Sequence, residues 1–96
     1  MGWPRGATAT ISAVNASGSS VVLLPENLNR HGFSVFNDDT GTLYIALAAT
    51  SSTSAFTVRL APSDLYEVPQ QSGYTGVVSG IWTAPGSGAA RITEWP

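Results

Sequence analysis

The chain has 96 residues, of which 43% are hydrophobic and only 10% are charged, and it contains no cysteine. Its length suits one small domain, and a chain without cysteine has neither disulfides nor thiolate metal ligands. Four basic and six acidic residues give a net charge of −2, which provides no basic surface for nucleic acid. No apolar segment approaches the roughly 20 residues of a transmembrane helix.

The low charge is the most unusual feature of the composition. Soluble domains usually carry about 25% charged residues, so the polar surface here must consist largely of serine, threonine, asparagine and glycine. Burying a hydroxyl or amide group costs less desolvation free energy than burying an ammonium group does. The composition therefore favours a subunit that meets other subunits over much of its surface. An ordinary hydroxyl-rich β-domain is the alternative.

The first seven residues contain two glycines and a proline, and they predict an irregular N-terminal arm, residues 1–7, before one domain at residues 8–96. In that domain, short alternating runs of apolar and polar residues are separated by turn residues, as in β-strands. The predicted strands are 8–14, 21–24, 33–36, 42–47, 55–60, 65–68, 76–82 and 90–95. In the first strand, Ala9, Ile11 and Ala13 form the apolar face.

Turn residues support these boundaries. The segment Asn37–Gly41, Asn-Asp-Asp-Thr-Gly, predicts a hairpin with Gly41 in a left-handed conformation and Asp38 bonded to the backbone. We place Gly32, at the start of the preceding strand, with these structural residues. The segment 61–64, Ala-Pro-Ser-Asp, fits a type I turn. At most one helical turn is expected, at residues 26–30.

About eight short strands at roughly ten-residue spacing predict an all-β fold. We expect a single antiparallel β-sandwich or barrel. Its connectivity is either jelly-roll-like or immunoglobulin-like, because the number of strands does not fix their order.

The sequence contains no motif typical of an enzyme. His31 is the single histidine, and without a nucleophile motif it is expected to be an exposed loop residue. Asp38 and Asp39 are expected to bond a turn backbone rather than to act as a catalytic pair or calcium site. The glycines at 73–80 lack the helix and lysine of a phosphate-binding loop. We therefore predict no catalytic, cofactor-binding or metal-binding residues.

The candidate interface residues lie at the two termini and in one loop. Trp3-Pro4 and Trp95-Pro96 stand near the chain ends, and exposed tryptophan is favoured at protein interfaces. The alternative is that these residues fold back over an open end of the sandwich. The guanidinium of Arg30 offers five donors, so we expect it either to tie loop carbonyls or a carboxylate together or to contact another subunit.

A different binding hypothesis concerns the aromatic residues. Tyr44, Tyr66, Tyr74 and Trp82 would form a stacking surface for a host glycan, although the three tyrosines are expected mainly as edge or rim aromatics.

A family resemblance extends over residues 9–94. The run Asn-Arg-His-Gly-Phe-Ser-Val-Phe-Asn-Asp at 29–38 is followed by Thr-Leu-Tyr-Ile-Ala-Leu at 42–47, with further strand segments at 56–60, 66–69, 74–78 and 80–82. This pattern resembles the small β-domains encoded among the structural genes of tailed bacteriophages. The resemblance implies a capsid decoration or cement protein, or a module of a tail or fibre protein. Its shared positions are architectural, so it implies no functional residue.

From this resemblance we expect a decoration subunit on the capsid exterior, assembled in the host cytoplasm, that binds the major capsid protein and stabilises its lattice. We expect a homo-oligomer, a trimer in preference to a dimer, without cofactor, nucleic acid or membrane. The alternatives are a low-copy neck, tail or fibre component and a module that binds a host-surface glycan or receptor.

Overall fold

The computed structural model describes residues 8–69 and 72–96. The predicted N-terminal arm, with Trp3 and Pro4, lies outside these residues. The strands are β1 (Thr10–Asn15), β2 (Val21–Leu24), β3 (Gly32–Asp38), β4 (Thr42–Ala46), β5 (Val58–Leu60), β6 (Leu65–Val68), β7 (Val78–Thr83) and β8 (Ala89–Trp95). The described residues contain no helix long and apolar enough to cross a membrane.

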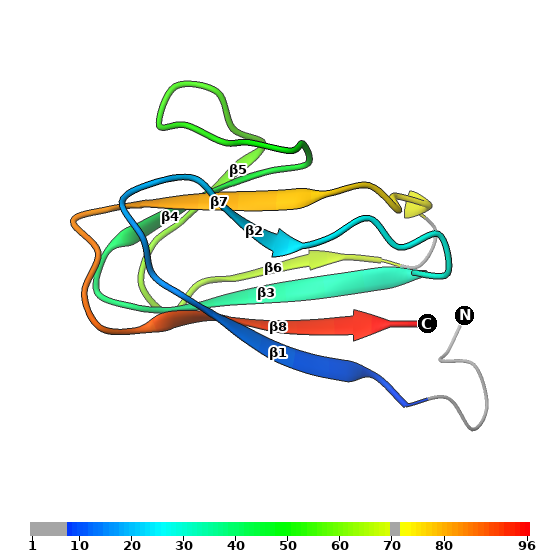
Figure 1. Cartoon of the computed structure of the whole chain (residues 1–96). Coiled ribbons are helices and arrows are strands. Elements are labelled where there is room, and N and C mark those ends of the chain that lie inside the picture. Colours follow the sequence, from blue (N-terminus) through cyan, green and yellow to red (C-terminus); the bar gives the residue numbers. More distant parts are fainter. Residues whose placement is uncertain (1–7, 70–71) are drawn as a thin grey trace.

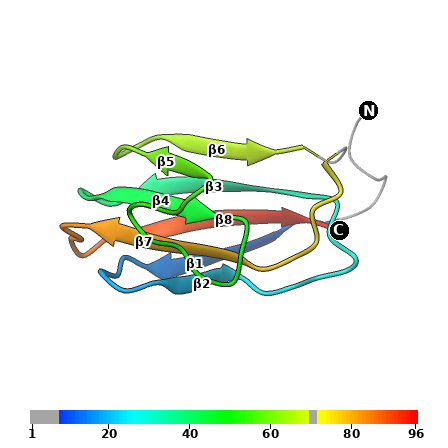
Figure 2. The ribbon, with the colours of Figure 1, turned by 90° about the horizontal axis from the view of Figure 1, so that it is seen from above.

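The eight strands form two antiparallel sheets that pack face to face (Figures 1 and 2), which confirms the predicted β-sandwich. Sheet A has the order β1-β8-β3-β6, and sheet B has the order β2-β7-β4-β5. The pairs β1–β8, β2–β7, β3–β6 and β4–β5 are those of one long hairpin folded over on itself. The pairs β3–β8 and β4–β7 then join these hairpin pairs into two four-stranded sheets. This strand order is that of a jelly roll, which decides between the two connectivities left open by the sequence.

The hairpin predicted at Asn37–Gly41 is wrong. This segment carries the chain from β3 in sheet A to β4 in sheet B, so the two strands that flank it do not pair. Gly41 has no positive φ. It is required instead because a Cβ at this position would collide with the carbonyl oxygen of Thr83 and lie 2.8 Å from that of Ala84. The turn residues were recognised correctly, but they mark a corner between the sheets.

The turn at 61–64 also connects the two sheets, and its predicted type is wrong. The N–H of Asp64 donates to the carbonyl of Ala61 at 3.0 Å, as in any closed β-turn. Ser63 has a φ of 70°, and a positive φ at the third turn position defines type II rather than type I. The segment 26–30 forms a hydrogen-bonded turn between Asn27 and Arg30.

The core lies between the sheets. Its buried members are Leu23, Leu24, Phe33, Val35, Leu43, Ile45, Leu60, Val68, Val78, Trp82, Ala90 and Ile92. The apolar face predicted for the first strand does not join this core. Residues directly opposite in a sheet share a face, and Ser12 and Val14 stand opposite Ile92 and Ala90. Ile11 therefore points outward, and 80% of it is exposed.

The outer faces of the two sheets differ. Residues 47–57 form a loop that crosses the outside of sheet B (Figure 2). The N–H of Ser51 donates to Oγ of Ser20 at 3.0 Å, and Oγ of Ser51 donates to the carbonyl of Tyr44 at 3.3 Å. Ser20 precedes β2 and Tyr44 lies in β4, so the loop spans β7 between them. The predicted strand 55–60 is accordingly shortened, and β5 begins at Val58.

Candidate functional site

Arg30 lies at the end of the sandwich where β3 begins, and its side chain is buried. Nε donates to Oε2 of Glu94 at 2.7 Å, and the terminal nitrogens donate to the carbonyls of Pro25 at 2.6 Å and Gly76 at 2.8 Å. The guanidinium also lies 5.5 Å from the ring centroid of Phe33. We call these residues the Arg30 cluster. It joins the β2–β3 connection, the β6–β7 connection and β8.

These contacts are those of a structural tie, the first of the two roles expected for Arg30. A buried guanidinium presents no surface to another subunit, so Arg30 is removed from the candidate interface residues. The neighbouring His31 is exposed, as predicted, and its N–H donates to the carbonyl of Trp95 at 2.9 Å. Gly32 is buried opposite Trp95, which is partly buried at the end of β8, and Pro96 is exposed.

The opposite end of the sandwich is held by a second group of polar side chains, which we call the Asn37 cluster. Nδ2 of Asn37 donates to the carbonyls of Gly41 at 2.9 Å and Leu60 at 3.0 Å. Its Oδ1 accepts the indole N–H of Trp82 at 3.1 Å. Asn37 belongs to sheet A. Two of its partners, Leu60 and Trp82, belong to sheet B, and the third, Gly41, directly precedes β4 of sheet B. One buried amide therefore joins the two sheets.

Asp39 completes the Asn37 cluster. Its carboxylate accepts backbone N–H groups from Gly41 at 2.9 Å, Gly86 at 3.0 Å and Gly88 at 2.8 Å. The N–H of Gly86 is the largest cause that lowers the pKa of Asp39 from its ordinary 3.8; burial opposes it, and the N–H groups of Gly41, Gly88 and Thr40 add to it. Asp39 therefore joins the β3–β4 corner to the β7–β8 connection.

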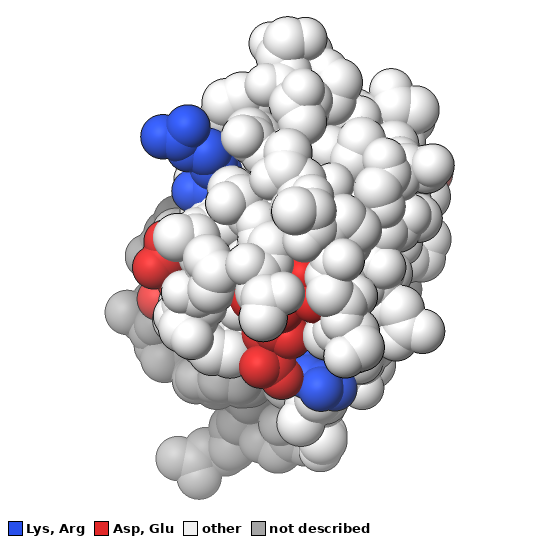
Figure 3. Space-filling model, turned by 90° about the vertical axis from the view of Figure 1, so that its left-hand side faces the viewer, with Lys and Arg blue, Asp and Glu red and all other residues white. Residues whose placement is uncertain are grey.

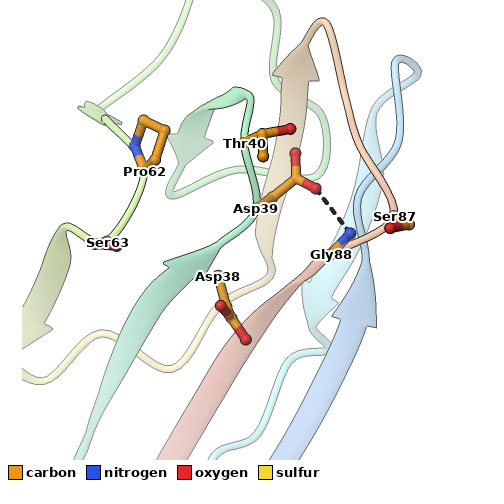
Figure 4. Close-up of a pocket in the computed structure, with 7 residues that line it drawn as sticks. All are labelled: Asp38, Asp39, Thr40, Pro62, Ser63, Ser87 and Gly88. Carbon is orange, nitrogen blue, oxygen red and sulfur yellow. Dashed lines mark hydrogen bonds between the residues drawn. The ribbon is translucent and has the colours of Figure 1, made fainter.

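A shallow hollow of about 460 Å³ opens beside this cluster (Figure 4). Its lining residues are Asp38, Asp39, Thr40, Pro62, Ser63, Ser87 and Gly88. Figure 4 shows the carboxylates of Asp38 and Asp39 pointing in different directions. Asp38 pairs with Nε of Arg91 at 3.1 Å, and Asp39 is occupied by backbone donors. The two acids are therefore not arranged as a catalytic pair, and the described residues contain no group of three metal-binding side chains.

The predicted aromatic stacking surface is not assembled. Trp82 is in the core, where its N–H is bonded to Asn37. Tyr66 packs against the core from β6, and Tyr74 donates its hydroxyl to the carbonyl of Val77 at 2.6 Å. These three side chains belong to different elements and are at least partly buried, so they offer no common platform.

Tyr44 is the tyrosine that differs. It lies on the outer face of sheet B, and its ring meets that of Phe56 edge-on, with centroids 4.9 Å apart. Phe56 comes from the loop over sheet B and is 41% exposed. Tyr44 is partly buried, so the pair forms a small, partly exposed aromatic surface.

The outer face of sheet A carries a surface that sequence reasoning missed. Ala13, Arg91, Phe36 and Leu65 stand in register and form one row across the four strands. The exposed large apolar side chains at the two edges of the sheet are Ile11 and Leu65, which is 58% exposed. No local signal reveals this row, because its members come from four strands that are distant in the sequence.

The charged side chains at the end of the sandwich that carries the Asn37 cluster form small groups. Figure 3 views the molecule from this end and shows mostly uncharged side chains, with the acidic and basic groups confined to small clusters. Arg91 and Asp38 form an ion pair at this end, and both side chains are more than half exposed. Exposed pairs of this kind contribute about 0–1 kcal/mol.

Comparison with known proteins finds no matching family model, no similar curated protein and no similar solved structure. The resemblance to phage β-domains therefore stays a prediction, and the fold is the property of this chain that the structure establishes: an antiparallel, eight-stranded β-sandwich.

Proposed function

We propose that this chain is a structural subunit of a bacteriophage virion, a decoration or cement protein that binds the outside of the major capsid protein lattice. The observation that carries the proposal is the outer face of sheet A on a jelly roll, a surface of apolar and hydroxyl side chains with three charged residues, Asp38, Glu67 and Arg91. Jelly rolls occur in viral capsid proteins and also in lectins and cupins. Because a fold does not specify a function, the proposal depends on this surface.

The outer face of sheet A suits a protein partner. Ile11, Ala13 and Leu65 supply apolar area, and the hydroxyls of Ser34 and Thr93 lie between them on the same face. Removing apolar and hydroxyl groups from water costs little free energy compared with removing charged groups. Lysine, which is depleted at protein interfaces, is absent from the sequence. Many copies bound to one lattice would hold adjacent capsid subunits together by avidity, even if each contact is weak.

The first test is the copy number of this chain per major capsid protein in purified particles, measured by quantitative mass spectrometry. A ratio near one, or a simple fraction of one, is expected for a decoration subunit. A few copies per particle would instead indicate a neck, tail or fibre component. Absence from the particle would overturn the virion assignment.

A second test asks which face binds. Leu65→Glu places a charge on the outer face of sheet A, and Phe56→Glu places the same charge over sheet B. We expect Leu65→Glu to lose binding to particles that lack the protein, whereas Phe56→Glu keeps it. Particles without the protein, or with the Leu65 variant, should rupture more readily on heating or on removal of divalent cations. Equal binding by both variants would exclude the sheet A face.

The Tyr44–Phe56 pair supports the second candidate function, a module that binds a host glycan or receptor. Exposed aromatic rings are suited to stacking on sugars. A glycan array with the unmodified protein tests this candidate, and Tyr44→Ala should remove any glycan that binds. An array without binding, together with unchanged phage adsorption by the variant, would exclude it.

A further inference from the structure

Each edge strand of a sheet exposes unpaired backbone N–H and C=O groups, and most proteins protect such edges with proline, charge, irregularity or shortness. Three of the four edges here carry such protection. β5 has three residues and includes Arg59. β2 has four residues, an irregular register and Pro25 directly after it. β6 has four residues, with Glu67 in the strand and Pro69 after it.

The fourth edge, β1, has none of these features. It is six residues long, Thr-Ile-Ser-Ala-Val-Asn, without charge, proline or a break in its register with β8. Five of its six residues are exposed. In Figure 1 it runs along the lower margin of the molecule, and among the described strands only β8 pairs with it.

The pairing with β8 shows which groups of β1 are free. The N–H of Ala16 donates to the carbonyl of Gly88 at 3.0 Å, one position beyond the Asn15–Ala89 pair. In an antiparallel ladder, alternate residues direct their N–H and C=O to the same neighbour. Even-numbered residues of β1 therefore bond β8. The N–H and C=O groups of the odd-numbered residues, Ile11 and Ala13 among them, point to the free edge.

We infer that this free edge pairs with β1 of a second copy of the chain, antiparallel and about a two-fold axis, with Ser12 opposite Ser12. Residues whose groups point outward must face one another. The register centred on Ser12 pairs all of them from Ala9 to Asn15. It brings no like charges together, and it places Ile11, the most exposed large apolar residue of the described part of the chain, beside the partner's Ala13.

This pairing extends sheet A across two copies into one continuous sheet. Because the contact is made by the same strand in both copies, it closes after two, and the protected edge at β6 does not extend it further. The inference therefore favours a dimer over the trimer expected from the phage resemblance. It concerns the isolated chain and does not depend on the proposed capsid function, so either can fail without the other.

Cross-linking tests the strand and its register together. The chain has no cysteine, so a single Ser12→Cys substitution supplies the one thiol. Directly opposed residues of a non-hydrogen-bonded pair lie about 4.5 Å apart at Cα, within the range of about 4.4–6.8 Å that disulfides need. We expect most of the oxidised Ser12→Cys protein to migrate as a covalent dimer.

The matched control is Thr10→Cys, on the same exposed strand. In the proposed register Thr10 faces the partner's Val14, and the two Thr10 positions lie four residues apart, roughly 14 Å along the strand. This variant should stay monomeric under the same oxidation. Equal cross-linking of both variants, or none with Ser12→Cys, would overturn the proposal.

The oligomeric state provides the second measurement, by light scattering coupled to size exclusion. The unmodified protein should be a dimer. Ala13→Pro removes one N–H from the free edge and none from the ladder with β8, a change that edge strands tolerate, so this variant should be monomeric with an unchanged circular dichroism spectrum. A monomeric unmodified protein at all concentrations, or a trimer, would contradict the inference.

Discussion

The two ends of the sandwich are both held by buried polar side chains, but their chemistry differs. At one end the Arg30 cluster neutralises two charges and joins loops that are far apart in the sequence. At the other end the Asn37 cluster uses a neutral amide and a carboxylate that is bonded only by backbone N–H groups. An ion pair and a set of backbone hydrogen bonds can therefore both hold an end of the sandwich together, but the stability lost on removing one partner differs between them.

The largest effect is expected at the Arg30 cluster. Arg30→Met removes the guanidinium and leaves the carboxylate of Glu94 mostly buried without its charge partner. Breaking a buried pair in this way costs about 3–5 kcal/mol, and two loop carbonyls lose their donors as well. Urea denaturation followed by tryptophan fluorescence measures the change in the free energy of unfolding.

The matched control for Arg30→Met is Arg91→Met, which breaks the exposed pair with Asp38 and should cost no more than about 1 kcal/mol. Arg30→Met combined with Glu94→Gln should be less destabilising than Arg30→Met alone, because no uncompensated charge is left. Similar losses for Arg30→Met and Arg91→Met would show that the buried cluster contributes nothing special.

A smaller loss is expected at the other end. Asn37→Ala leaves the indole N–H of Trp82 and the carbonyls of Gly41 and Leu60 without their partner. Each buried polar group left unpaired costs about 1–3 kcal/mol, and water entering the gap will recover part of this, so we expect a total of about 2–4 kcal/mol. Asn29→Ala, at an exposed loop position, should change stability by less than about 0.5 kcal/mol. Equal stability of the two variants would refute a bridging role for Asn37.

The turn glycines beside Asp39 come next. A Cβ at Gly88 would collide with the carbonyl oxygen of Asp38 and lie 2.8 Å from Cα of Asp39. Gly88→Ala must therefore displace backbone, and overpacking of this kind costs about 1–3 kcal/mol. Gly18→Ala is the control, since its nearest neighbour would be Pro85 at 3.9 Å. Thermal unfolding should show a clear decrease for the first variant and little change for the second.

The mildest test uses acid. The N–H of Gly86 and its neighbours lower the pKa of Asp39 below 3.8, so the folded state favours the charged form. The resulting stability is complete above the unfolded-state pKa and is lost as the pH falls through the lower, folded-state pKa. Asp39→Asn should remove this part of the pH dependence, so that its melting temperature falls less than that of the unmodified protein below about pH 4. Parallel curves for the two proteins would exclude the effect.

Local patterns located the strands well. The bounds of β2 and β6 agree with the sequence prediction. Pro25 and Pro69 directly follow these strands, and proline ends a strand because it has no N–H to donate to the ladder. The corner at Asn37–Gly41 was misjudged, since the same turn residues serve a hairpin and a passage between sheets. Which of the two forms depends on pairing partners elsewhere in the chain.

The polar clusters were only partly predictable. The donor geometry of Arg30 indicated a tie between loops, but its carboxylate partner is 64 positions away, and nothing local connects the two. Asp39 was expected to bond a turn, yet two of its donors belong to Gly86 and Gly88, in a different connection. Gly86 and Gly88 indicated a turn in the sequence, but their hydrogen bonds to Asp39 are visible only in the structure.

The class of the fold, the number of strands and most of their positions could be predicted from the sequence, because alternation and turn chemistry act over a few residues. The jelly-roll order and the direction in which the side chains of β1 face depend on contacts between distant strands, so they required the three-dimensional structure. Ile11 is outward because β1 pairs with β8 in a register that assigns Ser12 and Val14 to the core side. That register depends on the packing of the whole sandwich, because most of the contacts involved join residues that are far apart in the sequence.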